Sequence, residues 1–175
     1  DLLLKIQKTK PKSRIKNTVG KSYLIKKYSI NCMHKESDLL FDWYLPLWLN
    51  KKKVFNIKKK AKKILSLLYK RLNFSNSHFV HRDYHVQNLM KIGKKIGVID
   101  SQDALIGNPA YDLVSLIDDV RIKTSKKLKD KICNYYLKKT FRIYRIEPEK
   151  FLEDFNILSV QRSLKIIGIF SRLFR

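Results

Sequence analysis

Cysteine is scarce in this sequence, which has only Cys32 and Cys133 among its 175 residues. The two lie far apart and form no C-x-x-C pair, so neither a disulfide framework nor a structural zinc site is indicated. No apolar run approaches the ~20 residues that a helix needs to cross a bilayer, and no signal-peptide pattern opens the chain. We therefore expect a cytoplasmic protein with no membrane partner.

Acidic residues are also few, with 15 Asp and Glu against 39 Lys and Arg and a formal net charge of +24. Such a charge raises nucleic acid, anionic lipid and phosphate ligands as partners. The lysines are scattered, as in segments 51–53 and 58–63, over helix faces that we expect to be solvated, and they follow no aromatic-lined groove. A general compositional bias explains this pattern, so a basic nucleic-acid-binding module is kept only as an alternative.

Apolar residues make up 44% of the chain and aromatic residues 11%, which indicates a globular protein. The length is sufficient for one sizeable hydrophobic core. We expect residues 1–175 to form a single domain and the protein to be a monomer.

Polar side chains gather in the segment 81–88, His-Arg-Asp-Tyr-His-Val-Gln-Asn. A short strand is expected before it at 77–80. Two more are expected after it, the first starting at Leu89 and the second spanning 96–99, joined by a turn at 93–95. A loop held between strands can aim several polar side chains at one point. The segment is therefore a candidate active-site loop.

Asp83, Asn88 and Asp100 have the residue types that phosphoryl transfer requires. Their pattern is H-R-D-x-x-x-x-N, followed by a strand that ends in Asp. The reaction needs a carboxylate that accepts the proton of the attacking hydroxyl, and oxygen ligands that hold magnesium on the nucleotide phosphates. Magnesium prefers hard oxygen ligands, a preference that Asn88 and Asp100 meet.

The segment resembles the catalytic loop of the protein-kinase-like superfamily, and more closely its aminoglycoside-phosphotransferase branch, because Asp100 is followed by Ser101 and not by the Phe-Gly of protein kinases. Within that branch the chain is similar to the bacterial anomeric kinases of N-acetylmuramate and N-acetylglucosamine, which serve cell-wall recycling. The matching segments are residues 36–45, 81–85, 97–100, 102–104, 111–116, 161–165 and 168–170.

The resemblance implies an α+β fold of the protein-kinase-like type. The chain would form the mainly helical carboxy-terminal lobe, with a small β-hairpin that carries the metal site, and the amino-terminal lobe would be absent. The resemblance also implies ATP and Mg²⁺ as cofactors. The substrate would be a small sugar, phosphorylated on its anomeric hydroxyl.

The resemblance also suggests which residues act. Asp83 is the expected general base, and Asn88 and Asp100 are the expected ligands of magnesium and the nucleotide. Structural support is expected from His81, Arg82 and Asp112. In the superfamily an Asp at the place of Asp112 hydrogen-bonds the catalytic-loop backbone, and Arg82 either contacts phosphate or forms a salt bridge to Asp112.

Three further residues are candidate substrate contacts: Asp42, His85 and Asp103. His85 stands where the family also has His. Asp42 follows a segment with two other acids, and an equally good interpretation is that these carboxylates are ordinary surface groups.

Glycine is rare too, and none of the five glycines belongs to a G-x-G-x-x-G motif. In the family that motif and a phosphate-pairing lysine lie in the amino-terminal lobe. The chain also opens without Met, and its last helical pattern, 164–174, stops without a cap. We therefore expect a fragment at both ends that is inactive by itself, with a non-catalytic pseudokinase as an alternative.

The remaining chain is expected to be mainly helical. Apolar residues at spacings of three and four predict helices over 33–49, with a bend at Pro46, and over 56–74, 125–144 and 149–174. Segment 56–74 is expected to be the central buried helix. Pro109 should open a helix that runs through Ile117, whereas segments 10–20 and 104–109 are expected loops.

A different interpretation treats segment 81–85 as a strand, which would place His81, Asp83 and His85 on one face. Two imidazoles and one carboxylate are a ligand set for iron or zinc. This interpretation leaves Asn88 and Asp100 without a role, so we rank it well below phosphoryl transfer.

Overall fold

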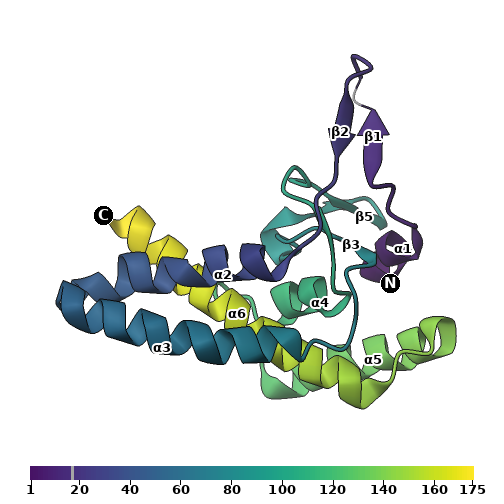
Figure 1. Ribbon diagram of the computed structural model, residues 1–175. Helices are drawn as coiled ribbons and strands as arrows, with labels where there is room; N and C mark the ends of the chain where they lie inside the picture. The colour runs from purple at the N-terminus through teal and green to yellow at the C-terminus, as the bar shows by residue number, and fades with distance from the viewer. Residues whose placement is uncertain (17) are drawn as a thin grey trace. The chain divides into compact units, whose positions relative to one another are not determined.

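The computed structural model describes residues 1–16 and 18–175, apart from the side chains of residues 143 and 144. The chain divides into two compact units (Figure 1). Unit 1 consists of Asp1–Tyr28 and Asn73–Phe155, and unit 2 consists of Ser29–Leu72 and Asn156–Arg175. The expected mixture of helices and small sheets is confirmed, while the single-domain assignment stays a prediction. No helix among the described residues is long and apolar enough to span a membrane.

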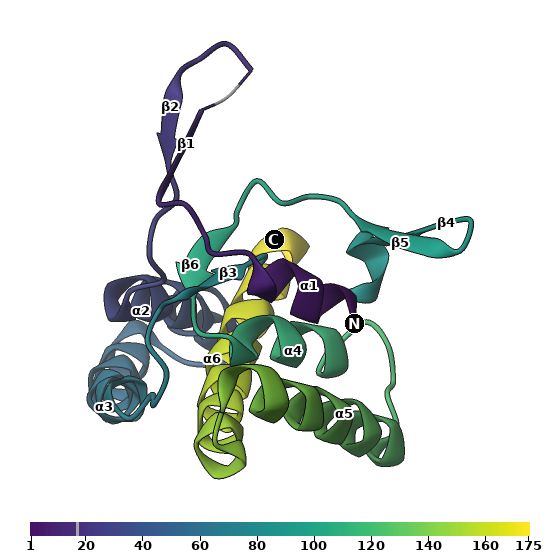
Figure 2. The same ribbon diagram turned by 90° about the vertical axis from the view of Figure 1, so that its right-hand side faces the viewer.

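Unit 1 combines short strands with helices. Its strands pair as three antiparallel two-stranded sheets among the described residues, β1 with β2, β3 with β6 and β4 with β5. Figure 2 shows the β1–β2 and β4–β5 hairpins as separate arms of this unit. Its elements are α1 (Leu2–Lys8), β1 (Arg14–Lys16), β2 (Ser22–Leu24), β3 (His78–Val80), β4 (Leu89–Ile92), β5 (Lys95–Val98), β6 (Leu105–Gly107), α4 (Ala110–Ile117), α5 (Lys126–Tyr144) and the start of α6 (Pro148–Phe174).

Helix α4 lies at the centre of the core of unit 1. Seven of its eight residues are buried, as expected for a short helix that is apolar on nearly all sides. The rings of Tyr28 and Tyr111 meet edge to face with their centroids 5.1 Å apart. Pro109 directly precedes the helix, because its fixed φ suits a helix start, and the prediction of a helix up to Ile117 is confirmed.

Unit 2 is helical. Helix α2 (Ile30–Leu39) continues into a π-helical turn (Leu40–Tyr44) and a 3-10 turn (Leu45–Leu47), after which α3 (Lys51–Lys70) runs back along it (Figure 1). Ser29 and Asn50 cap α2 and α3 by accepting hydrogen bonds from the backbone N–H groups of Cys32 and Lys53. Pro46 lies in the 3-10 turn, so the α-helical ladder ends before it, as its missing N–H requires.

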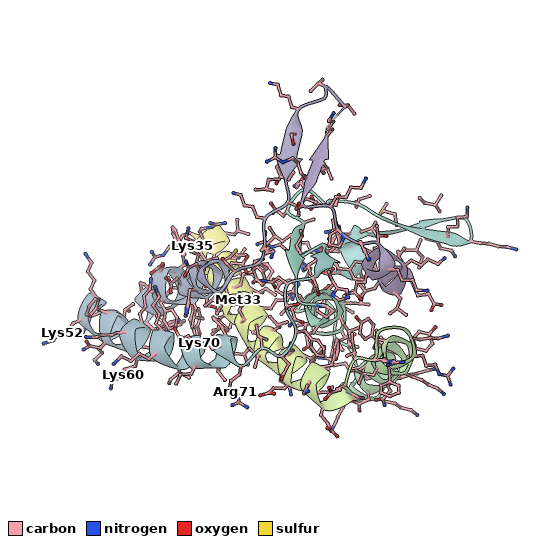
Figure 3. All side chains as sticks on the ribbon, turned by 45° about the vertical axis from the view of Figure 1, so that its right-hand side comes forward. Met33, Lys35, Lys52, Lys60, Lys70 and Arg71 are labelled. Atoms are coloured by element: carbon pink, nitrogen blue, oxygen red, sulfur yellow. The ribbon has the colours of Figure 1, made fainter. Side chains whose placement is uncertain are left out.

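Helix α3 corrects the expectation of a central buried helix. It spans Lys51–Lys70 and not 56–74, and only Leu65 and Tyr69 of it are buried. Ile64 and Leu67 are 60% and 66% exposed. In Figure 3 the labelled Lys52 and Lys60 extend away from α3 toward solvent, and Lys70 is exposed as well. The apolar residues of this segment are spread over more than one face of the helix, and only one of these faces is covered.

Two segments expected to be loops contain strands. Segment 10–20 contains β1, and segment 104–109 contains β6, which pairs with β3 in the register Phe79↔Ile106. Both strands are three residues long; β1 lies between Pro11 and Gly20, and β6 ends at Gly107, so the local pattern carries little strand signal. Pairing with β2 and β3 is what makes these two segments strands.

Gly168 on α6 allows a close approach to α2 within unit 2. A Cβ atom at this position would lie 2.3 Å from the carbonyl carbon of Leu39 and 2.6 Å from its oxygen. Backbone atoms cannot move aside as a flexible side chain can, so the two helices would have to separate.

We expect Gly168→Ala to lower the free energy of unfolding by about 1–3 kcal/mol, the range for overpacking. Urea unfolding measures the change. Alanine alone favours a helix over glycine by about 1 kcal/mol, so a variant more stable than the wild type would contradict the close approach. Ser163→Ala, at an exposed position of the same helix, is the control and should change stability little.

Candidate active site

Asp112 holds the start of segment 81–88 through two backbone hydrogen bonds. The backbone N–H of His81 donates to Oδ2 of Asp112 at 2.8 Å, and that of Arg82 donates to Oδ1 at 3.0 Å. Asp112 is fully buried in the first turn of α4. Arg82 has a φ of +74°, in the left-handed region that ordinary side chains disfavour. The carboxylate thus fixes a bend that the chain would not adopt alone.

Asn88 closes the other end of the segment onto Asp83. Its side-chain Nδ2 donates to the backbone oxygen of Asp83 at 2.9 Å, and the backbone N–H of His85 donates to the same oxygen at 3.0 Å. The amide nitrogen of Asn88 is therefore occupied, whereas its amide oxygen has two lone pairs to offer. Asp83 and Asn88 are both half-buried.

The hairpin β4–β5 brings Asp100 next to Asn88. Leu89 pairs with Val98, and one step further along the ladder the backbone N–H of Ile99 donates to the oxygen of Asn88 at 3.1 Å. Asp100 follows at once with a φ of +64°, a left-handed turn that ends the strand at an exposed carboxylate. The strand pairing therefore places Asn88 and Asp100 near each other at the same end of the hairpin.

His81 lies beneath this turn. It is 1% exposed, and its Nε2 is 2.9 Å from the backbone oxygen of Ile99. Because a carbonyl oxygen only accepts, Nε2 must carry the hydrogen. Through this hydrogen bond His81 connects the loop to the turn at Asp100.

Tyr84 is a buried acid of the loop. It is 3% exposed, and its burial, together with the Asp112 carboxylate, raises the pKa of Tyr84 to about 12. The hydroxyl therefore stays protonated at neutral pH and acts as a donor. It adds no negative charge near Asp83.

The sequence matches the model of a known family, described as "Phosphotransferase enzyme family", over residues 28–147. The match covers more than half of the chain. The chain belongs to this phosphotransferase family.

Curated relatives of this phosphotransferase chain are named N-acetylmuramate/N-acetylglucosamine kinase. The relative from Neisseria meningitidis is 32% identical over 154 residues, which is 86% of this chain and 46% of the relative. The relative from Pseudomonas aeruginosa is 35% identical over 149 residues, 83% of this chain and 44% of the relative. The relative from Caulobacter vibrioides is 33% identical over 100 residues, 54% of this chain and 27% of the relative. The chain spans less than half the length of the curated relatives it matches.

Three residues were expected to contact the substrate, and they lie in different settings. In unit 1 of the phosphotransferase chain, His85 is buried and Asp103 is exposed, and the backbone oxygen of Asp103 accepts a hydrogen bond of 3.3 Å from Nη1 of Arg82. Asp42 belongs to unit 2, where Nζ of Lys58 lies 2.6 Å from its Oδ1. The roles of all three stay predictions.

Asp154 is a supporting residue that the sequence interpretation missed. This fully buried carboxylate of α6 accepts hydrogen bonds from the backbone N–H groups of Asn73 and Phe74 at 2.7 and 2.9 Å. It also accepts from Nδ2 of Asn108 at 2.5 Å, and Oδ1 of Asn108 accepts from the N–H of Ala110 at 2.9 Å. Asp154 thereby stabilises the start of α4, the helix that carries Asp112. The sequence offered one signal for Asp154, namely a charged residue within the apolar stripe of a helix.

The interpretation as an iron or zinc site is wrong. Strand β3 ends at Val80, so segment 81–85 is not a strand and its side chains do not alternate. His81 uses Nε2 to bind the backbone of Ile99. No group of three or more His, Cys, Asp and Glu residues in the described part of the phosphotransferase chain is placed to hold a metal ion.

Proposed function

We propose that this chain is part of a kinase that transfers the γ-phosphoryl group of ATP to the anomeric hydroxyl of N-acetylmuramate or N-acetylglucosamine. Family membership supports the reaction class, and the names of the relatives support the acceptor. The cell-wall recycling role follows from the same names.

In this proposal Asp83 accepts the proton of the attacking hydroxyl. The half-buried loop supports this role, because Asp112 and Asn88 fix the backbone on either side of Asp83 and leave its carboxylate out of these bonds. A base held in a fixed position loses little entropy when the acceptor arrives.

Asn88 and Asp100 would hold magnesium. The donor set fits, since an amide oxygen and a carboxylate are hard ligands, and the strand pairing places the two residues next to each other. When bound, the ion would neutralise charge on the nucleotide phosphates. The hydrogen bond from Nδ2 of Asn88 to Asp83 carries the proposal best, because it turns the amide nitrogen inward and ties the proposed ligand to the proposed base.

We further propose that the chain corresponds to the carboxy-terminal lobe of a kinase-like fold. Its coverage of 46% and 44% of two relatives fits one lobe of such a fold. The catalytic-loop pattern of Asp83 and Asn88, together with the lack of a G-x-G-x-x-G motif in this sequence, favours the carboxy-terminal lobe. The phosphate-covering loop would come from the other lobe. The isolated chain would then not catalyse phosphoryl transfer. Its cytoplasmic location and monomeric state stay predictions.

The magnesium dependence of the full-length protein tests the proposed ligand. We expect Asn88→Ala to raise the Mg²⁺ concentration for half-maximal phosphorylation of the amino sugar by about 10-fold or more, the scale for a weakened metal site. Asn88→Asp retains an oxygen ligand and should raise it less. Gln87→Ala, at the exposed neighbouring amide, is the control. An unchanged Mg²⁺ requirement in Asn88→Ala would remove Asn88 from the metal site.

A further inference from the structure

The solvent face of helix α3 carries positive charge only. No residue of α3 is acidic, and its buried residues, Leu65 and Tyr69, lie on one side of the helix. At 100° per residue, the opposite side presents six exposed lysines: Lys52, Lys53, Lys59, Lys60, Lys63 and Lys70. Within the described part of the chain these six lysines form no ion pair. We call this side of α3 the basic face.

The acids next to α3 are bound on its covered side. Nζ of Lys58 lies 2.6 Å from Oδ1 of Asp42 and 3.4 Å from Oδ2 of Asp38, and Nζ of Lys62 lies 2.8 Å from Oδ2 of Asp38. Lys58 is seven residues before the buried Leu65, so it shares the side of the helix that packs on α2. These carboxylates therefore do not neutralise the basic face.

The basic face also exposes aliphatic side chains. Ile64 is 60% exposed and Leu67 is 66% exposed. Ile64 follows Lys60 by four residues and Leu67 follows Lys63 by four, so each lies beside a lysine of this face. The lysine side chains surround a hollow of about 330 Å³, which is lined by Asn56, Lys59, Lys60 and Lys63. The face thus combines ammonium groups, a hollow and apolar surface.

We propose that the basic face of α3 binds the surface of an anionic lipid bilayer, with the helix lying in the plane of the interface. The ammonium groups contact lipid phosphates, and each lysine near such a surface favours binding by about tenfold or slightly less. Ile64 and Leu67 enter the boundary between headgroups and acyl chains, as the apolar residues of interfacial helices do. The sequence argued against a membrane partner only from the lack of a spanning run.

Charge and apolar surface together favour a bilayer over the other possible partners. A second copy of this chain would bring lysines against lysines, because a two-fold interface pairs each face with itself. Nucleic acid would satisfy the lysines, but phosphate and sugar give Ile64 and Leu67 no apolar environment. An anionic bilayer matches both the charge and the aliphatic side chains.

Sedimentation of the full-length protein with lipid vesicles tests the proposal. The protein should sediment with vesicles of equal parts phosphatidylglycerol and phosphatidylcholine, and not with vesicles of phosphatidylcholine alone. Replacing Lys59, Lys60 and Lys63 together with Gln should lower the partition coefficient by about 100-fold, since three charges leave the interface. The same replacement of Lys127, Lys131 and Lys138, which are exposed on α5 in unit 1, is the matched control and should lower it far less.

The double variant Ile64→Gln/Leu67→Gln separates a bilayer from nucleic acid. It keeps every charge and should lower the partition coefficient by at least about 10-fold, because two side chains no longer leave water. Both side chains are exposed, so the variant should keep the wild-type melting temperature.

Three results would overturn the proposal. The first is no sedimentation with the anionic vesicles. The second is an equal loss in the two triple-lysine variants, which would mean that net charge alone attracts the chain. The third is full vesicle binding by Ile64→Gln/Leu67→Gln, which would assign the face to general polyanion binding, such as nucleic acid.

Discussion

Asp83→Asn should lower kcat of sugar phosphorylation by about 10²–10⁴-fold, the usual contribution of a general base. An amide cannot accept the proton of the attacking hydroxyl, whereas its size and shape are those of the carboxylate. KM for ATP and for the sugar should change little, because the backbone bonds of the loop are made by the Asp83 carbonyl oxygen and survive the substitution. Steady-state kinetics of the full-length protein measure the effect.

Asp130→Asn is the matched control, since it makes the same chemical change at an exposed position of α5. It should leave kcat unchanged. The thermal unfolding of both variants should equal that of the wild type. A full-rate Asp83→Asn variant would mean that another group accepts the proton, and the assignment of the loop would be lost.

Asp112→Ala should lower the free energy of unfolding by about 2–6 kcal/mol. The substitution leaves the buried backbone N–H group of His81 and the partly buried one of Arg82 without an acceptor, and each orphaned group costs about 1–3 kcal/mol. Where the variant still folds, kcat should also fall, because the loop that carries Asp83 loses its anchor. Urea unfolding and kinetics on the same samples separate the two effects.

Asp118→Ala provides the comparison for Asp112→Ala. Asp118 caps the other end of α4 and lies 2.6 Å from Nζ of Lys129 in a partly exposed ion pair. Such a pair contributes about 0–1 kcal/mol, so this variant should remain near wild-type stability. If both substitutions lower the free energy of unfolding by the same amount, Asp112 is an ordinary helix-end carboxylate and does not organise the loop.

The β4–β5 hairpin and α4 could be predicted because their signals are local. A glycine at Gly93 with a φ of +57° makes the turn of the hairpin, and Pro109 marks the start of the helix. Strands β1 and β6 could not, because three-residue strands depend on partners that sequence spacing does not reveal. The division into two units runs through the continuous helix α6, which shows no break in its pattern.

The candidate site shows the same contrast. The placement of Asp83, Asn88 and Asp100 near one another could be predicted because the spacing of a loop and a hairpin constrains it directly, while their roles stay predictions. Asp154 could not, since its partners, Asn73 and Asn108, are distant in the sequence. Buried polar networks are set by tertiary contacts, and only the presence of a charge in an apolar helix stripe points to them.

The position of the transferred phosphate tests the central claim most directly. Phosphorus NMR of the full-length protein with ATP, Mg²⁺ and N-acetylmuramate or N-acetylglucosamine would identify the product. The account predicts a phosphate ester coupled to the anomeric proton of the sugar, formed by the wild type and not by Asp83→Asn. An ester on any other hydroxyl, or no transfer to either sugar from a protein that binds ATP and Mg²⁺, would contradict it.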